Sequence, residues 1–426
     1  MEHNAVNNPT IKAFFIFTLV ALYGMSCEAP DKKDRTIPDQ AGTNYISYAD
    51  DVAFLKNYMD VIELVSPSAN ARIALSAALQ GRVMTSTSGG AAGRSYGWIN
   101  REHFISGDTL DHINPFGGEE RFWLGPESGQ FSLFFDSTAD QPSWKTPRLL
   151  DLEPFWVSHQ EKDKVVFTKK ATLKNYSGFT FNLAIEREIA MLSRETIARE
   201  LELEDIKGLQ MVGYRSTNTL KNEGDVDWRK ETGLLSIWLL GMYPPTATAT
   251  VVIPYKAGND LEMGVPVNDA YLDGVPAERL IVDDNVIYFR ADGRFRSKIG
   301  LLPQRAKDVL GSWDDASGVL TIVKYNKPES VTDYVNSLGD FQNDPYAGDV
   351  INSYNDGPSA PGEKPLGPFY ELETSSPALA LKAGESGIHI QWTVHFEGDE
   401  AMLSKITKKL LKVSLEEIKT GFETLD

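Results

Sequence analysis

Hydrophobic and polar residues alternate in short runs along most of the chain, and clusters of Gly, Asn, Asp and Pro separate these runs. Alternation with a period of two is typical of β-strands that bury one face. Few helical patterns lie between the runs, so we expect a mostly antiparallel β-sandwich over residues 71–398 rather than βαβ units. The predicted strands are Arg72–Ala77, Gly81–Thr87, Gln130–Asp136, Lys164–Leu173, Phe179–Met191, Thr196–Leu203, Leu234–Leu240, Thr248–Pro254, Val286–Phe289, Gly318–Tyr325, Phe369–Thr374 and Gly387–Phe396.

Helical spacing appears on both sides of this β-rich region. Apolar residues that recur every three or four positions predict a helix over Ala49–Leu64, within a segment of residues 48–70, and a C-terminal helix within residues 399–426. The residues with this spacing are Val52, Leu55, Met59 and Ile62 in the first segment, and Leu403, Ile406, Leu410 and Val413 in the second. No internal repeat and no linker interrupts the region between them.

The N-terminus has the pattern of a targeting signal. Lys12 precedes the apolar run Ala13–Tyr23, which is too short to span a bilayer but suits the core of a signal peptide over residues 1–26. Cys27, the only cysteine, follows directly, and this arrangement resembles a bacterial lipoprotein signal. We therefore expect a lipidated Cys27 with a polar tether over residues 27–47, and a location in the bacterial envelope, periplasmic or outer-membrane-associated. The alternative is a cleaved secretory peptide with an incidental cysteine.

Charge and motif content exclude several classes of function. The 426 residues carry a net charge of −18, which argues against nucleic acid as a partner, because phosphate binding requires clustered Lys and Arg. The chain contains neither a G-x-S-x-G nucleophile motif nor a phosphate loop that ends in G-K-[ST]. His389 and His395 lie six positions apart on one strand face, too far apart to share a metal, and indicate a polar sheet surface. We expect no metal and no cofactor.

Asn114–Gln130 groups more chemistry than any other stretch of comparable length. Gly117-Gly118 permits a sharp turn, because glycine adopts positive φ without a Cβ clash. The polar and aromatic residues that follow are Glu119, Glu120, Arg121, Trp123 and Glu127. Carboxylates and a guanidinium bind sugar hydroxyls, and an aromatic face covers the C–H surface of a sugar ring. The alternative interpretation is an ordinary hairpin with a salt-bridged surface.

Two further segments add candidate ligand contacts. Asp349–Asp356 contains Asn352 and Asp356, which could hydrogen-bond a ligand, although Asn-Asp-Gly-Pro is also favourable turn chemistry. His103 and His112 flank an acid-rich loop and are either site residues or exposed loop histidines.

Glu371 and Glu373 form a pair of carboxylates on one strand face. Strand geometry separates them by about 6.5–7 Å, while Tyr370 and Leu372 take the other face. If both carboxyl groups are desolvated, one of them has a raised pKa and suits general acid or base catalysis near neutral pH.

The order of motifs around Glu373 resembles the galactose mutarotase superfamily, whose aldose 1-epimerase-like members fold as an antiparallel β-supersandwich. The resemblance rests on Leu372-Glu373-Thr374, Pro377, Leu381, Gly384-Glu385 and Phe396. It implies that Glu373 takes the position of the family's catalytic base. Phe116 replaces the histidine that precedes two glycines in the family, and Thr217–Gly224 lacks the histidine that serves as the acid. The chain also resembles lipoproteins of Bacteroidetes-type bacteria built on this fold.

Two functions from different classes follow from these patterns. The first is an enzyme that acts near the anomeric centre of a sugar (an epimerase, hydrolase or lyase), with Glu373 as base, Glu371 beside it, and His112 or Arg121 as the acid or electrostatic partner. The second is a non-catalytic glycan-binding lipoprotein that serves a neighbouring transporter or enzyme. In both, residues far apart in sequence meet in one carbohydrate-binding cleft. Its predicted lining is Glu119, Glu120, Arg121, Trp123, Glu127, Asn352, Asp356, Glu371 and Glu373.

Overall fold

The computed structural model describes residues 36–38 and 44–422, apart from residues 69, 136–142, 340 and 361. The predicted signal peptide and Cys27 lie outside the described residues. Within the predicted tether, Thr36–Pro38 forms strand β1 and pairs with β2 (Asn44–Ile46). No helix in the described part of the chain is long and apolar enough to cross a membrane.

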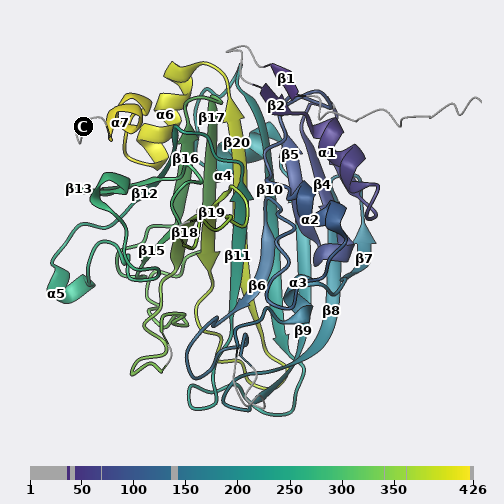
Figure 1. Ribbon diagram of the computed structural model, residues 1–426, viewed down its shortest axis with the longest axis vertical. Coiled ribbons are helices and arrows are strands. Elements are labelled where there is room, and N and C mark those ends of the chain that lie inside the picture. The colour runs from purple at the N-terminus through teal and green to yellow at the C-terminus, as the bar shows by residue number, and fades with distance from the viewer. Residues whose placement is uncertain are drawn as a thin grey trace, which may run out of the picture. The chain divides into compact units, whose positions relative to one another are not determined.

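A ten-stranded sheet forms one layer of the fold. Its strand order is β13-β14-β12-β16-β17-β20-β10-β9-β8-β7, and every neighbouring pair is antiparallel. Figure 1 shows β20 between β17 and β10, although these strands are far apart in sequence. The strands are β7 (Trp156–Gln160), β8 (Lys164–Lys174), β9 (Thr180–Met191), β10 (Gln210–Asn222), β12 (Ala249–Pro254), β13 (Leu280–Asp283), β14 (Val286–Arg290), β16 (Val309–Asp314), β17 (Val319–Tyr325) and β20 (Ser386–Glu397).

A five-stranded sheet with the order β15-β18-β19-β11-β6 faces the larger one, and a three-stranded sheet with the order β3-β4-β5 adjoins them. The described pairs in these sheets are also antiparallel, so the predicted mostly antiparallel β fold is confirmed. The strands are β3 (Ile62–Val65), β4 (Arg72–Ser76), β5 (Arg82–Thr87), β6 (Arg121–Gly125), β11 (Ser236–Tyr243), β15 (Ser297–Leu301), β18 (Ile351–Asn355) and β19 (Tyr370–Ser375).

Apolar side chains fill the space between the two large sheets. Ile237 and Leu239 of β11 belong to a core cluster that includes Phe167 and Leu183 of the ten-stranded sheet. Leu372 of β19 similarly packs in a cluster with strands β12, β14, β16 and β17. Because side chains alternate along a strand, Leu240, Glu371 and their neighbours must point to the opposite face of the five-stranded sheet.

Helices cover the outer face of the ten-stranded sheet, where Ile197, Leu403, Ile406 and Ile418 join a cluster with Leu320. Figure 1 shows α6 and α7, in yellow, close to β16 and β17. The α-helices are α1 (Tyr48–Leu55), α2 (Arg101–Ser106), α3 (Arg148–Asp151), α4 (Arg194–Glu200), α5 (Asp260–Met263), α6 (Glu400–Leu410) and α7 (Leu415–Thr420), and the 3₁₀ helices are η1 (Ala77–Leu79) and η2 (Ala277–Arg279).

The N-terminal helix is shorter than the sequence pattern suggested. The Ser47 side chain accepts a hydrogen bond from the Asp50 backbone N–H and caps α1, which ends at Leu55. Ile62 and Leu64 instead lie in strand β3, where Leu64 pairs with Ile73. Ile62 continues the helical spacing from Met59, whereas Ile62 and Leu64 have the spacing of a strand, and pairing with β4 selects the strand.

Three further elements differ from the predicted pattern. Thr196–Leu203, predicted as a strand, overlaps α4, because the Ser193 side chain caps the helix and Ile197 turns to the core. Residues 130–135 form turns instead of a strand. The C-terminal helix breaks into α6 and α7 at Lys412, whose φ of 69° is left-handed, before a capping box between Ser414 and Glu417 starts α7.

Candidate functional site

A cavity of about 390 Å³ lies over the face of the five-stranded sheet that points away from the ten-stranded sheet. We call it the first cavity. Met242 of β11 and Glu371 of β19 line it, whereas the adjacent residues Tyr243 and Leu372 belong to the core between the sheets. The volume falls within the range of small-molecule sites, roughly 300–1,000 Å³.

Strand register brings distant charged residues together in this cavity. Leu240 pairs with Arg121 of β6 on one side and with Glu373 of β19 on the other. Glu371 of β19 and Lys298 of β15 both pair with Tyr354 of β18, so these two residues lie two strands apart. Adjacent strands are about 4.8 Å apart, so the backbones are about 10 Å apart between Arg121 and Glu373 and between Glu371 and Lys298, and the long side chains span the gaps.

Arg121 and Glu371 form a buried ion pair in the cavity wall. The guanidinium Nη2 lies 2.6 Å from Glu371 Oε1, and the two side chains are 5% and 6% exposed. The same guanidinium stacks over Trp123, 4.6 Å from the ring centroid. Arg121 thus covers one face of Trp123, a residue that we had predicted as a stacking platform for a sugar.

Glu373 lies beneath the first cavity and is fully buried. Its Oε2 accepts a hydrogen bond of 2.9 Å from Trp238 Nε1 and is 3.2 Å from Lys298 Nζ. The Lys298 ammonium in turn lies 4.7 Å from the Trp238 ring centroid. The cavity is lined by Glu371, Trp238 and Lys298 but not by Glu373. Glu373, the predicted base, therefore holds Trp238 and Lys298 from below and does not face the cavity itself.

The carboxylates outnumber the cations in this cluster. Glu127, Glu371 and Glu373 accompany Arg121 and Lys298, which leaves an excess of one negative charge. Burial raises the pKa of Glu371 to about 8, with Arg121 opposing and Glu373 reinforcing the shift. Burial also raises the pKa of Glu127. One carboxyl group of the cluster therefore holds a proton near neutral pH.

Lys298 keeps its charge in spite of its surroundings. Burial acts to lower the pKa of its ammonium, but Glu373, followed by Glu127 and Glu371, outweighs that effect and raises the pKa. Lys298 is therefore a fixed cation and is not suited to be a nucleophilic amine at neutral pH.

Aromatic side chains complete the cavity. His112 lies exposed at its edge, with Nδ1 2.8 Å from the Trp144 carbonyl oxygen and its ring 4.6 Å from the indole. The Tyr271 hydroxyl donates a 2.6 Å hydrogen bond to Asp349, whose pKa burial raises to about 6. The other aromatic lining residues are Trp123, Trp238, Tyr354 and Phe369.

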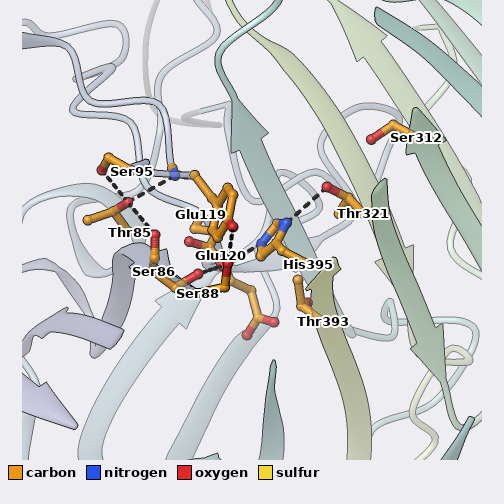
Figure 2. A network of polar contacts seen from close by, with 12 residues as sticks. Thr85, Ser86, Ser88, Ser95, Glu119, Glu120, Ser312, Thr321, Thr393 and His395 are labelled. Atoms are coloured by element: carbon orange, nitrogen blue, oxygen red, sulfur yellow. Dashed lines mark hydrogen bonds and ion pairs between the residues drawn. The ribbon is translucent and has the colours of Figure 1, made fainter. Parts of the chain in front are cut away.

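The structure places Glu119 and Glu120 away from this cavity, in the interior between the sheets (Figure 2). Glu120 forms an ion pair of 2.8 Å with Arg187, and both side chains are fully buried. Glu119 accepts hydrogen bonds from Ser86 and His395. The turn at Gly117-Gly118 directs the two acids inward before β6 begins at Arg121, whereas their order in the sequence had suggested a common role with Arg121.

Asn352 and Asp356 are buried and do not line the first cavity. Asn352 Nδ2 donates to the Ile299 carbonyl oxygen at 3.2 Å. Asp356 accepts hydrogen bonds from the Tyr354 hydroxyl and the Gly367 backbone N–H, at 3.0 and 2.6 Å. These contacts hold β18 and the loop that precedes β19, which is a structural role.

Several residues of the cavity had no recognisable signal in the sequence. Lys298 lies in the short strand SKIGL, and Trp238 lies in an apolar strand. Tyr271 lies in a loop without regular secondary structure. Only strand pairing with β19 and β18 identifies Trp238 and Lys298 as neighbours of Glu373 and Glu371, and only its hydrogen bond to Asp349 places Tyr271 there. In the described ranges, no cluster of three or more His, Cys, Asp or Glu residues could hold a metal ion.

The fold is similar to several solved galactose mutarotase-like structures. A galactose mutarotase-like protein from Lactobacillus casei is 11% identical, with a TM-score of 0.47 over 79% of this chain and 100% of that chain. The Slr1438 protein from Synechocystis is 13% identical, with a TM-score of 0.46 over 80% and 96%. A galactose mutarotase related enzyme from Lactobacillus acidophilus is 9% identical, with a TM-score of 0.44 over 80% and 98%.

No curated protein matches the sequence. A family profile, however, covers residues 46–422, which include the β-rich region and the first cavity in full. The chain therefore belongs to this family, DUF6786, which is described as a family of unknown function.

Proposed function

We propose that the first cavity binds a carbohydrate of one or two sugar rings. The observation that carries the proposal is the buried Arg121–Glu371 ion pair in the wall of an aromatic cavity of about 390 Å³. Sugar hydroxyls both donate and accept hydrogen bonds, so paired guanidinium and carboxyl groups suit them. Trp144, Tyr271 and Phe369 supply apolar surface for the C–H faces of the ring.

The same geometry supports acid–base chemistry near the anomeric centre. Glu371 lines the cavity and has a pKa raised to about 8, so its carboxyl group can donate a proton at neutral pH. Glu127 also lines the cavity and is the other carboxyl group available there. Glu373 and Lys298 act from below, where their charges set the protonation of Glu371. The reaction would be an epimerisation, a hydrolysis or an elimination.

A second candidate is non-catalytic glycan binding, and the position of Glu373 favours it. An enzyme of this kind needs an acid and a base that both reach the substrate. Glu373 does not line the cavity, and its Oε2 already accepts from Trp238 and contacts Lys298. In this version the protein is an envelope lipoprotein that binds glycans for a neighbouring transporter or enzyme and is anchored through lipidated Cys27.

Calorimetric titration of the full chain with a panel of mono- and oligosaccharides tests the proposal. We expect at least one sugar of the panel to bind and Arg121→Ala to weaken that binding at least tenfold, because the change removes a guanidinium from the cavity wall and leaves Glu371 without its hydrogen-bond donor. Arg279→Ala is the matched control, since Arg279 also pairs with a mostly buried carboxylate, Asp292, but lies outside the cavity. Equal losses in both variants, or no binding across the panel, would refute the proposal.

Incubation of the bound sugar with the protein then separates the two candidates. An enzyme changes the sugar's anomeric NMR signals or releases new reducing ends, and Glu371→Gln abolishes that change. A binding protein leaves the sugar intact.

A further inference from the structure

A second cavity, of about 330 Å³, opens on the other face of the same two strands. Tyr243 and Tyr370 line the second cavity, whereas the adjacent residues Met242 and Glu371 line the first. Tyr243 and Tyr370 are paired across β11 and β19, so one layer of backbone separates the two cavities. The function proposed above does not use the second cavity.

His395 of β20 lies at the base of the second cavity, between Glu119 and Thr321 (Figure 2). Its Nε2 is 2.9 Å from Glu119 Oε1, and its Nδ1 is 2.9 Å from the Thr321 hydroxyl oxygen. If Nε2–H donates to the carboxylate, Nδ1 accepts from Thr321. The imidazole also stacks on the Tyr96 ring, with 4.4 Å between the ring centroids, so three contacts fix its position.

Two polar atoms next to His395 have no hydrogen-bond partner among the described residues. One is the hydroxyl oxygen of Tyr243, a residue that lines the cavity and is 2% exposed. The other is Oε2 of Glu119, the carboxylate that holds His395. A buried polar group without a partner costs about 1–3 kcal/mol, so native proteins normally supply one. The Tyr243 oxygen itself is covered and lies against Gly241 of its own strand, so it is an unsatisfied group beneath the cavity floor.

Hydroxyl groups dominate the polar part of the wall. The Asp314 carboxylate accepts hydrogen bonds from Thr246, Thr248 and Ser317. A hydroxyl that donates to a carboxylate keeps lone pairs with which it can accept from a ligand. The Arg94 guanidinium in the wall stacks on Tyr45, at 4.6 Å from the ring centroid. Asp314 and Glu119 disfavour an anion, and the donors already on Asp314 reduce its attraction for a cation.

We propose that the second cavity is a binding site for a small neutral polyhydroxylated molecule of monosaccharide size. The ligand's hydroxyls donate hydrogen bonds to Thr246 and Ser317, and the aromatic rings of Trp98 and Tyr370 provide apolar contact for its C–H groups. This site is separate from the first cavity, so the full chain has two independent saccharide sites.

Calorimetry on the full chain tests this proposal, with glucose, galactose and mannose as the probes. Thr246→Trp places an indole at a half-buried position in the cavity wall, and we expect it to remove one of two binding events. Thr248→Trp is the matched control, because Thr248 lies in the same loop and also bonds Asp314 but does not line the cavity.

The outcomes distinguish this site from the first. Binding that Arg121→Ala weakens and Thr246→Trp leaves intact would overturn the second site alone. Binding that Thr246→Trp removes and Arg121→Ala leaves intact supports it even if the proposed function of the first cavity fails. Sugar phosphates, uronates or amino sugars that bind at the Thr246-dependent site in place of neutral sugars would overturn the proposed ligand class.

Discussion

Arg121 and Glu371 are 250 positions apart in the sequence and form an ion pair of 2.6 Å in the wall of the first cavity. The pair joins β6, at one edge of the five-stranded sheet, to β19 across the intervening strand β11. Such a buried pair is costly to break from one side, because the remaining polar group then stays buried without its hydrogen-bond partner. The proposed carbohydrate site rests mainly on this pair and its position in the cavity wall.

The Glu373–Lys298 pair beneath the cavity should contribute strongly to folding. Glu373→Gln leaves Lys298 without the carboxylate that holds its charge, so we expect the free energy of unfolding to fall by about 3–5 kcal/mol in urea titrations. Lys298→Met combined with Glu373→Gln should cost less than the sum of the two single changes, because the double variant has no unpaired charge. Additive losses would show that the two side chains do not interact.

Stability should depend on pH through Glu371. The folded protein holds a proton on this carboxyl group up to about pH 8, whereas the unfolded chain releases it near its ordinary pKa of 4.5. The folded state binds more protons between these values, so this group's contribution makes stability fall as pH rises from about 4.5 to 8. Urea midpoints of the wild type and Glu371→Gln, measured at pH 5 and pH 8, should shift in favour of the variant at pH 8. A difference that is independent of pH would contradict the raised pKa.

Glu120 should matter for folding and not for sugar binding. Glu120→Gln leaves the fully buried Arg187 without a countercharge, and we expect a loss of about 3 kcal/mol or more in unfolding free energy. Affinity at the first cavity should remain unchanged in the same preparation. Glu188→Gln is the control, because Glu188 forms partly exposed pairs with Lys164 and Arg215 and its loss should cost at most about 1 kcal/mol. A large loss of sugar affinity in Glu120→Gln would contradict this prediction and show that Glu120 contributes to sugar binding.

Membrane attachment should depend on Cys27. Replacement by Ser removes the sulfur that a lipid would modify, and we expect the protein to move from the membrane fraction to the soluble fraction of bacterial cells. Firm anchoring generally needs more than one acyl chain, which a lipidated N-terminal cysteine supplies. An unchanged distribution in fractionation would favour a cleaved secretory peptide instead.

Much of the fold could be predicted from local patterns. A period of two along β19 places Tyr370 and Leu372 on one face and Glu371 and Glu373 on the other, and the structure has this arrangement. The same alternation predicted the antiparallel sheets, because strand periodicity depends only on neighbouring residues. Helix positions were less certain where spacing fits two structures, as in Ile62–Val65, which pairs with β4 as a strand.

Tertiary structure alone decided which faces are buried and which side chains meet. His389 and His395 were expected on a polar sheet surface, yet both are 1% exposed and face the interior, whereas Ile388 on the other face of β20 is 50% exposed. Buried polar groups need partners, and Glu119 supplies one to His395, while Thr374 of the facing sheet supplies one to His389. Lys298 likewise became part of the site only through the pairing of β15 with β18. Periodicity along a strand identifies its two faces, but the neighbouring layers determine which charged and hydrogen-bonding groups contact each face.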